Sequence, residues 1–252
     1  MSAAERFDLS GRVAVVTGGS RGLGREMILA FAEAGADVVI ASRKLDNCEA
    51  LAAEVRERFG REALAVGSHV GEWDQMTELA ETSIAHFGHV DILVNNAGMS
   101  PLYGSLSEVS EGLWDKVLGV NLKGAFRLSS LIGEHMVERG SGSIINVSSI
   151  AGSKPTPREV PYGAAKAGLE NMTSSMAQAF GPAVRVNCIA AGPFLTDISN
   201  AWDMEVFEAT AKASIALQRG GRPDEVVGAA LYLASDASSY CTGAVLHLDG
   251  GS

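Results

Sequence analysis

The sequence predicts an α/β domain in which helices cover both faces of a doubly wound parallel sheet. Two patterns support this class. Short apolar runs alternate along the whole chain with longer stretches of helical spacing. The interiors of the short runs are continuously apolar, which is typical of strands covered on both faces. The 252 residues contain no linker, repeat or low-complexity segment, so we expect a single domain over residues 1–252.

The first half of the chain contains four expected strands. They are VAVVT (13–17), DVVIA (37–41), ALAVGS (63–68) and DILVNNAG (91–98), the last of which continues into a loop. Residues 23–35, 45–60 and 72–87 carry apolar side chains at helical spacing. Gly35 and Gly60 close the first two of these helices, as expected where a helix ends in the left-handed region.

The second half continues the alternation. Helices at about 110–119 and 121–139 lead into the strand SIINVSS (143–149), and a long helix at 162–181 leads into AVRVNCIA (183–190). A helix at 223–235 and the strand AVLHL (244–248) end the series. The segment from about 194 to 215 is expected to form a short helical lid. Its apolar residues are Phe194, Ile198, Trp202, Met204 and Phe207.

Composition excludes several classes of function. A net charge of −10 and a pI of about 5.0 disfavour a nucleic-acid or membrane-surface role. Cys48, Cys188 and Cys241 are odd in number and far apart, which favours a reducing compartment over a disulfide framework. The five histidines form no metal-ligand pattern with them, so no metal site is predicted. Without a bilayer-spanning run or a signal core, we expect a cytoplasmic protein.

Glycines are concentrated in TGGSRGLG (17–24), between the first expected strand and the first helix. Gly18, Gly22 and Gly24 allow a sharp turn and the close approach of a pyrophosphate to the backbone. The following helix points its N-terminal N–H groups at the same place. At this position in a doubly wound sheet, the pattern predicts a dinucleotide site rather than a purely structural turn.

The end of the second strand indicates which dinucleotide binds. About 20 residues after the glycines, such folds place the residue that contacts the adenosine ribose, and a carboxylate there disfavours a 2′-phosphate. Here Ser42 and Arg43 occupy the position, and no acidic residue occurs from Ala41 to Leu45. Arg21, in the glycine loop, could approach the same point, and guanidinium groups suit a phosphate. NADP(H) is therefore preferred and NAD(H) is possible. The alternative is a solvated loop with unrelated cations.

Tyr162 and Lys166 lie four residues apart on an expected helix and share a face. A free tyrosine has a pKa of about 10, and we expect the nearby ammonium of Lys166 to lower the pKa of Tyr162. Such a pair can protonate a carbonyl oxygen or deprotonate an alcohol. Ser149 follows the fifth strand at the carboxyl edge of the sheet, where its hydroxyl can hold a substrate oxygen. Alternation along the strand turns Ser148 the opposite way.

Together these motifs resemble those of the short-chain dehydrogenase/reductase family, and the likeness covers nearly the whole chain. TGGSRGLG is similar to the family's cofactor loop, NNAG (95–98) to its motif after the fourth strand, and VNLKG to the segment with its helix asparagine, here Asn121. Ser149, Tyr162 and Lys166 match the rest of the family's catalytic tetrad. GRPDEVVGAALYLASDASSYCTG and LDGG are similar to its C-terminal region. The resemblance implies a Rossmann fold with a substrate lid.

The resemblance also implies a role for each matching position. Tyr162 would be the general acid/base, and Lys166 would lower its pKa and hold the nicotinamide ribose. Ser149 would polarise the carbonyl, Asn121 would support a water in a proton relay, and Thr196 would contact the nicotinamide amide. The implied cofactor-binding residues are Gly18, Ser20, Arg21, Gly22, Leu23, Gly24, Ser42, Arg43, His69, Val70, Asn95, Ala97, Gly98, Tyr162, Lys166, Gly192 and Thr196.

Three features depart from the family pattern. His69 stands at or near the place of an aspartate that touches adenine, so it would stack on adenine, donate to it or simply pack. AGP (191–193) replaces the usual Pro-Gly before the lid and bears on the lid hinge. The loop SKPTPREVP (153–161) has three prolines and two cations, Lys154 and Arg158, which either meet an anionic substrate or are solvated.

We therefore expect an NADP(H)-dependent oxidoreductase that interconverts a ketone and a secondary alcohol by hydride transfer. The apolar lid favours a partly hydrophobic substrate. The alternatives are a reductase of 3-oxoacyl groups on acyl carrier protein or CoA, and a non-catalytic NADP(H) sensor, which the intact tetrad disfavours. No Lys or Arg occurs from Ala167 to Val184, which weighs against an acidic carrier protein docking on that helix. The family implies a homotetramer or homodimer.

Overall fold

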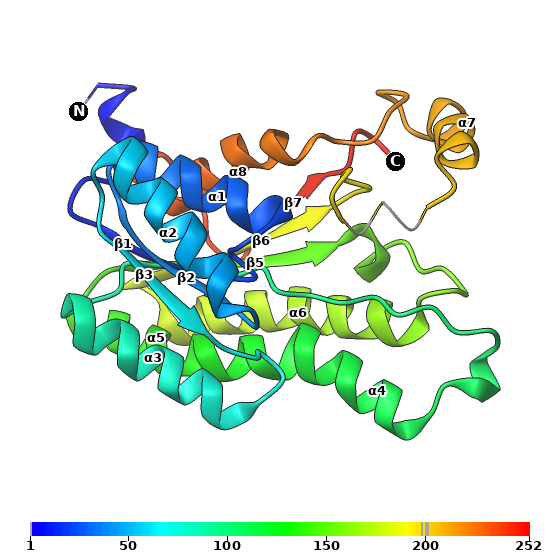
Figure 1. The fold of residues 1–252 in the computed structure, drawn as a ribbon, viewed down its shortest axis with the longest axis horizontal. Coiled ribbons are helices and arrows are strands. Elements are labelled where there is room, and N and C mark those ends of the chain that lie inside the picture. Colours follow the sequence, from blue (N-terminus) through cyan, green and yellow to red (C-terminus); the bar gives the residue numbers. More distant parts are fainter. Residues whose placement is uncertain (1, 198, 200–201) are drawn as a thin grey trace.

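A parallel sheet of seven strands forms the centre of the molecule, with helices on both sides (Figure 1). The computed structural model describes residues 2–197, 199 and 202–252, and Ile198 of the expected lid lies outside them. The strands are β1 (Val13–Thr17), β2 (Asp37–Ser42), β3 (Ala63–Gly67), β4 (Ile92–Asn95), β5 (Gly142–Ser149), β6 (Val184–Ala191) and β7 (Val245–Leu248). The α-helices are α1 (Gly22–Glu33), α2 (Leu45–Phe59), α3 (Trp73–Phe87), α4 (Glu111–Leu118), α5 (Gly124–Arg139), α6 (Val160–Phe180), α7 (Met204–Ser214) and α8 (Val227–Ala234).

The strand order is β3-β2-β1-β4-β5-β6-β7. The chain proceeds outward in one direction from β1 and in the other from β4, so the winding reverses between these two strands. Loops at the carboxyl ends of such a pair diverge and leave a crevice in which ligands bind. The expected α/β fold with a doubly wound parallel sheet is confirmed.

Helices α1, α2 and α8 cover one face of the sheet, and α3, α5 and α6 cover the other (Figure 1). Alternate residues of each strand enter the two layers. In β2, Val38 and Ile40 pack with the first group of helices, whereas Val39 and Ala41 pack with the second. Each fully buried aliphatic side chain contributes about 1.5–3 kcal/mol. Burial on both faces explains why the strands are apolar at consecutive positions.

Two expected elements are shorter than their sequence patterns. The fourth strand ends at Asn95, and the rest of the 91–98 pattern is the loop into which it was expected to continue. Beyond it, the backbone N–H groups of Asn96 and Ala97 donate to the Thr17 hydroxyl at 3.1 and 3.2 Å instead of continuing the ladder. The last helix, expected from residue 223, begins as a 3₁₀ turn over Pro223–Val226 and becomes α-helical at Val227.

The joint between α4 and α5 is a π-helical turn, Gly119–Lys123, where the sequence predicted only a break between two helices. Close packing explains the glycine that follows it. A Cβ atom on Gly124 would lie 1.8 Å from the carbonyl oxygen of Val70, so no other residue fits there. Single π turns are frequent at functional sites because they redirect side chains within a helix. This turn contains Asn121.

The lid includes α7, which lies within the expected range of 194–215. Trp202 and Phe207 pack together with ring centroids 4.9 Å apart. Phe194 is buried, and its backbone forms a bridge with Gly221. Much of the apolar surface of the lid is therefore used for packing within this region.

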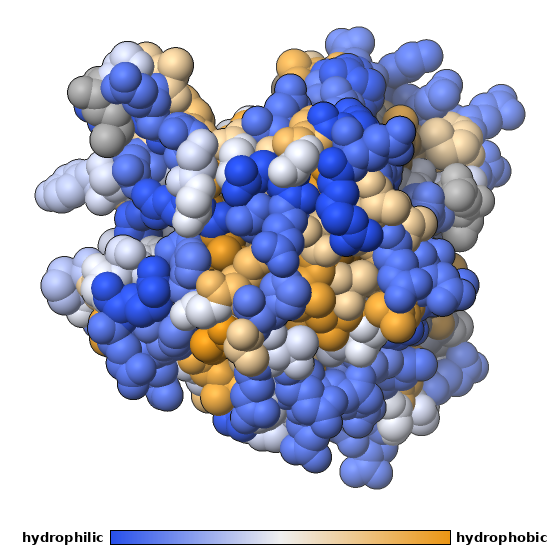
Figure 2. Space-filling model, turned by 60° about the vertical axis from the view of Figure 1, so that its left-hand side comes forward, coloured by the Kyte–Doolittle hydropathy of each residue, from blue (hydrophilic) through white to orange (hydrophobic). Residues whose placement is uncertain are grey.

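The molecular surface in Figure 2 is mostly hydrophilic, but hydrophobic residues gather across the middle of the face shown. Large apolar side chains are exposed on several described elements, among them Trp114, Phe126 and Leu246. A contiguous apolar area on a polar surface is typical of a contact surface. Over the described ranges, no helix combines the length and hydropathy needed to cross a bilayer.

Candidate active site

The glycine loop between β1 and α1 is packed against Asn96, which follows β4. The Asn96 amide donates to the carbonyl oxygens of Thr17 and Gly18, at 3.0 and 3.2 Å. A Cβ atom on Gly18 would lie 2.9 Å from the Asn96 amide nitrogen, and one on Gly24 would lie 2.3 Å from the Gly18 carbonyl oxygen. The glycines thus allow the loop to turn closely against Asn96 and against itself at the start of α1. A cradle of this shape beside a helix N-terminus fits the pyrophosphate of a dinucleotide.

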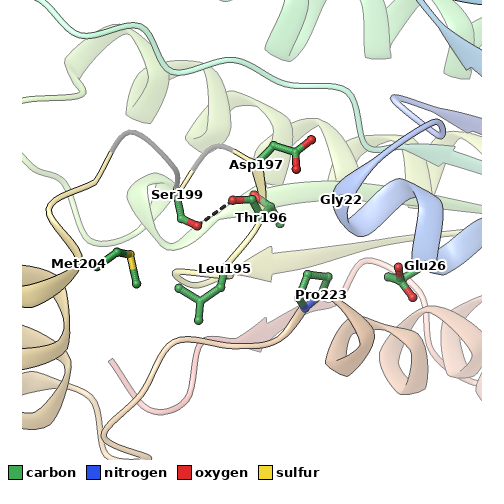
Figure 3. Close-up of a pocket in the computed structure, with 8 residues that line it drawn as sticks. All are labelled: Gly22, Glu26, Leu195, Thr196, Asp197, Ser199, Met204 and Pro223. Atoms are coloured by element: carbon green, nitrogen blue, oxygen red, sulfur yellow. Dashed lines mark hydrogen bonds between the residues drawn. The ribbon is translucent and has the colours of Figure 1, made fainter. Parts of the chain in front are cut away.

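A cavity of about 580 Å³ lies between the glycine loop and the first part of the lid (Figure 3). This volume is ordinary for a small-molecule site. Thr196 lies on the lid side of the cavity, and a Cβ atom on Gly22 would be 3.5 Å from its methyl carbon. The lining residues are Gly22, Glu26, Leu195, Thr196, Asp197, Ser199, Met204 and Pro223. Gly22 and Thr196, both expected at the cofactor, are therefore neighbours.

Arg21 extends toward the lid rather than toward the end of β2. Its guanidinium lies 3.7 Å from the Asp197 carboxylate, and both side chains are more than half exposed. An exposed pair of this kind contributes little to stability. The sequence suggested that Arg21 could approach the same phosphate as Ser42, and in this structure its partner is the Asp197 carboxylate of the lid.

Ser20 and Ser42 do come together at the end of β2. Their hydroxyl oxygens are 2.9 Å apart, and the buried thiol of Cys48 donates to Ser42 at 3.2 Å. Arg43 is exposed immediately beyond this pair. Two hydroxyls and a guanidinium therefore lie where a carboxylate would otherwise select NAD(H).

Tyr162, Lys166 and Ser149 meet at the carboxyl edge of the sheet. Lys166 is only 3% exposed, and its ammonium donates to the Val147 carbonyl at 2.8 Å. It lies 5.6 Å from the centre of the Tyr162 ring. The Ser149 hydroxyl accepts a hydrogen bond from the Ala151 N–H at 3.2 Å. Pro161 near the start of α6 and the (i, i+4) spacing explain how one helix presents Tyr162 and Lys166 together.

Ser148 faces away from this group, as alternation along β5 requires. Its hydroxyl donates its single proton to the Glu170 carboxylate at 2.8 Å, and the Lys166 carbonyl lies 3.2 Å away as the alternative acceptor. Ser149 is therefore the strand serine whose hydroxyl remains near Tyr162.

The pKa of Tyr162 moves in the direction opposite to the sequence expectation. Burial raises it to about 12, a hydrogen bond with Ser149 opposes the rise, and the charge of Glu159 adds to it. Burial also lowers the pKa of Lys166 to about 8, and the negative charge of Glu170 opposes this shift. The expectation of an acidified phenol is wrong for this structure, because desolvation of the phenolate outweighs the hydrogen bond with Ser149. Near neutral pH, Tyr162 keeps its proton and Lys166 is charged.

Asn121 projects from the π-helical turn and is 1% exposed. Its amide donates to the carbonyls of Met99 and Val117 at 2.9 Å, and its oxygen accepts from the Met99 N–H at 3.2 Å. A Cβ atom on Gly98 would lie 3.0 Å from the Asn121 amide oxygen and 3.6 Å from the Lys166 ammonium. Asn121 and Lys166, which are far apart in sequence, therefore converge at Gly98.

Asn95, a predicted cofactor residue, has its side chain inside the core. Its amide donates to the Ser129 hydroxyl and to Asn146, both at 2.8 Å, and Asn146 continues to Thr173. The side chain of Asn95 therefore links β4 to the helices behind the sheet. Asn96, which holds the glycine loop, was not among the predicted residues. The two neighbouring asparagines of NNAG could have predicted this division of roles. Side chains alternate along a strand, so only one of the two can face the glycine loop.

The other predicted cofactor residues lie near the same edge of the sheet. His69 is held in its own turn, where its backbone N–H donates to Gln75 at 2.7 Å and its ring accepts from Gly71 at 3.1 Å. Val70 is next to it, and its carbonyl contacts Gly124. Gly192 donates to the Leu248 carbonyl, and a Cβ atom there would meet Asp249 at 2.5 Å. Leu23 packs against the core, and the Ala97 N–H is bonded to Thr17.

Comparisons with known proteins agree with this geometry. Residues 18–252 match the family described as Enoyl-(Acyl carrier protein) reductase. The chain is 37% identical over 251 residues to Dehydrogenase/reductase SDR family member 4 of Bos taurus, with 99% of this chain and 90% of that protein covered. A solved 3-oxoacyl (acyl-carrier-protein) reductase from Agrobacterium tumefaciens with NADP bound is 33% identical and has a TM-score of 0.94, over 100% of this chain and 98% of the other. A 7 alpha-hydroxysteroid dehydrogenase complexed with NADH and 7-oxo glycochenodeoxycholic acid is 30% identical and has a TM-score of 0.94, over the same shares of both chains.

Proposed function

Because the chain belongs to the short-chain dehydrogenase/reductase family, we propose that it uses NADP(H) to interconvert a ketone and a secondary alcohol. The observation that supports this most strongly is the convergence of Ser149, Tyr162 and Lys166 beside the glycine loop. A sensor that only bound the dinucleotide would have no use for a buried acid/base pair next to a hydroxyl.

In the reductive direction, Tyr162 is the proton donor. Its phenol keeps its proton near neutral pH, because burial raises its pKa to about 12. The Ser149 hydroxyl binds the same carbonyl oxygen and orients it toward Tyr162. The charged Lys166 is anchored on Val147 and is positioned to hold the hydroxyls of a ribose. When bound, the reduced nicotinamide supplies the hydride.

The preference for NADP(H) is supported by the end of β2. Ser42, paired with Ser20, and the exposed Arg43 offer donors to a 2′-phosphate. No carboxylate occurs between Ala41 and Leu45 to bind the two ribose hydroxyls of NAD(H). The Agrobacterium tumefaciens neighbour has NADP bound, whereas the hydroxysteroid dehydrogenase is complexed with NADH. Because the two neighbours differ in their cofactor, the proposed preference rests on the residues of this chain.

A 3-oxoacyl group on acyl carrier protein or CoA is the second candidate substrate. The family description and the Agrobacterium tumefaciens neighbour favour it. The net charge of −10 and the lack of Lys and Arg from Ala167 to Val184 weigh against docking of an acidic carrier. A free, partly hydrophobic ketone therefore remains the first proposal.

We also propose that the protein is cytoplasmic and forms a homodimer or homotetramer. Its acidic composition, the three dispersed cysteines and the apolar area in Figure 2 support this assignment.

The function is tested by the oxidation of NADPH in the presence of a panel of ketones, for wild type and for Tyr162→Phe. We expect turnover by wild type and a fall of about 10²–10⁴-fold in kcat for the variant. Tyr232→Phe, on the exposed side of α8, is the matched control and should behave as wild type. Equal turnover by Tyr162→Phe would exclude the proposed acid, and no turnover by wild type would exclude the proposed class of reaction.

A further inference from the structure

Glu159 places a carboxylate at the entrance of the candidate active site, three residues before Tyr162. It occupies the N-cap position of α6, where its carbonyl accepts from the Gly163 N–H at 2.7 Å. Its side chain crosses to the loop after β4, and the Ser100 hydroxyl donates to it at 3.3 Å. Ser100 is two residues from Gly98, at which Asn121 and Lys166 converge. Glu159 therefore joins two loops that lie beside Lys166 and Tyr162.

Tyr103 fixes the position of this carboxylate. Its hydroxyl accepts from the Val160 N–H at 2.8 Å and donates to the Pro157 carbonyl at 3.1 Å. These two bonds hold the proline-containing loop against the segment after β4, on either side of Glu159. The Glu159 carboxylate thus lies between two loops that hydrogen bonds hold together.

The cations of the same loop do not neutralise Glu159. The Lys154 ammonium is 3.6 Å from the Asp249 carboxylate, on the other side of the loop. Arg158 is adjacent in sequence but exposed. Within the part of the chain that the structure describes, no ion pair within 4 Å involves Glu159. Its charge reaches Tyr162, whose pKa it raises.

From this arrangement we propose that Glu159 selects substrates by charge, favouring ketones without an anionic group near the carbonyl over ketones with a carboxylate or phosphate there. The proposal rests on the proposed oxidoreductase function and specifies its substrate class. A carboxylate two carbons from the reacting carbonyl would lie close to the half-buried carboxylate of Glu159. Repulsion between like charges is strong under those conditions.

The test compares a neutral and an anionic form of one substrate, ethyl acetoacetate and acetoacetate, at saturating NADPH. Glu159→Gln removes the charge but keeps an acceptor for the Ser100 hydroxyl, so the hydrogen bond between the two loops is preserved. Glu57→Gln, exposed near the C-terminal end of α2, makes the same change in net charge away from the site. We expect Glu159→Gln to raise kcat/KM for acetoacetate relative to the ester by about tenfold. Glu57→Gln should leave this ratio unchanged.

An unchanged ratio in Glu159→Gln would overturn the inference while leaving the proposed function intact. Absence of turnover by wild type on every ketone would instead contradict the proposed function.

A second measurement then decides the role of Glu159 without turnover. The chain has four tyrosines, so a ¹³Cζ-tyrosine NMR titration, assigned with Tyr162→Phe, can follow the Tyr162 phenol. Glu159→Gln should lower its pKa, and an unchanged pKa would show that the carboxylate does not act on the site.

Discussion

The Lys166 ammonium lies 5.6 Å from the centre of the Tyr162 ring, and both groups are presented by one face of α6. Burial acts on the two in opposite directions. It lowers the pKa of the ammonium to about 8 and raises that of the phenol to about 12. Near neutral pH the pair therefore holds one positive charge and one transferable proton. This state suits the protonation of a carbonyl oxygen.

The buried charge of Lys166 should reduce the stability of the folded protein. Lys166→Met is expected to be more stable than wild type at pH 7, by about 1–3 kcal/mol, because it removes the cost of desolvating the ammonium. The pKa of Lys166 is about 8 in the folded protein and 10.5 for an ordinary lysine. Between these values the unfolded chain binds the extra proton, so wild-type stability rises with pH and the difference shrinks. Urea denaturation from pH 7 to 10 measures this. A difference that is independent of pH would contradict the buried-charge explanation.

The charge at the end of β2 should determine the choice of cofactor. Arg43→Asp is expected to weaken NADPH binding by about 10–100-fold and to favour NADH, because a carboxylate repels the 2′-phosphate and accepts from ribose hydroxyls. Fluorescence titration of both dinucleotides measures the effect. Arg58→Asp, at the far end of α2, makes the same charge change away from the site and should leave the preference unaltered. Equal or tighter binding of NADH by wild type would overturn the proposed preference.

The glycine loop should not tolerate a side chain at its third glycine. Gly24→Ala is expected to destabilise the protein by about 1–3 kcal/mol and to weaken cofactor binding, because its Cβ atom would lie 2.3 Å from the Gly18 carbonyl oxygen. Gly112→Ala is the control, since nothing lies within 4 Å of a Cβ atom there. In α4 this control should raise stability by about 0.5–1 kcal/mol. Thermal unfolding with and without NADPH separates the two effects. Wild-type behaviour of Gly24→Ala would show that the loop relaxes easily.

The two asparagines of NNAG should have separable roles. Asn96→Ala is expected to weaken dinucleotide binding about 5–20-fold with little loss of stability, because it releases the glycine loop from its two amide bonds. Asn95→Ala should instead cost about 1–3 kcal/mol of stability, since it leaves buried partners unsatisfied. Calorimetric titration and urea denaturation of each variant give the two quantities. The reverse pattern would mean that Asn95 contacts the cofactor.

Regular elements were predictable because their signals are local. The run Val38–Ala41 is apolar at every position, and this alone indicates a strand covered on both faces. The spacing of Tyr162 and Lys166 predicts a shared helix face for the same reason. The ends of elements were less predictable, since the π-helical turn at Asn121 depends on the contact between Gly124 and a carbonyl about 50 positions earlier, at Val70.

The sequence by itself determined the layered α/β fold, the place of the glycine loop and the identity of the residues at the carboxyl edge, because periodicity and motif spacing are properties of neighbouring positions. Tertiary structure alone decided that Asn95 turns inward while Asn96 holds the loop, and that Arg21 is paired with Asp197 rather than directed at Ser42. It also decided that Tyr162 keeps its proton, and that Glu159 reaches Ser100. These outcomes depend on burial and on distances between segments far apart in the chain, which no local pattern encodes.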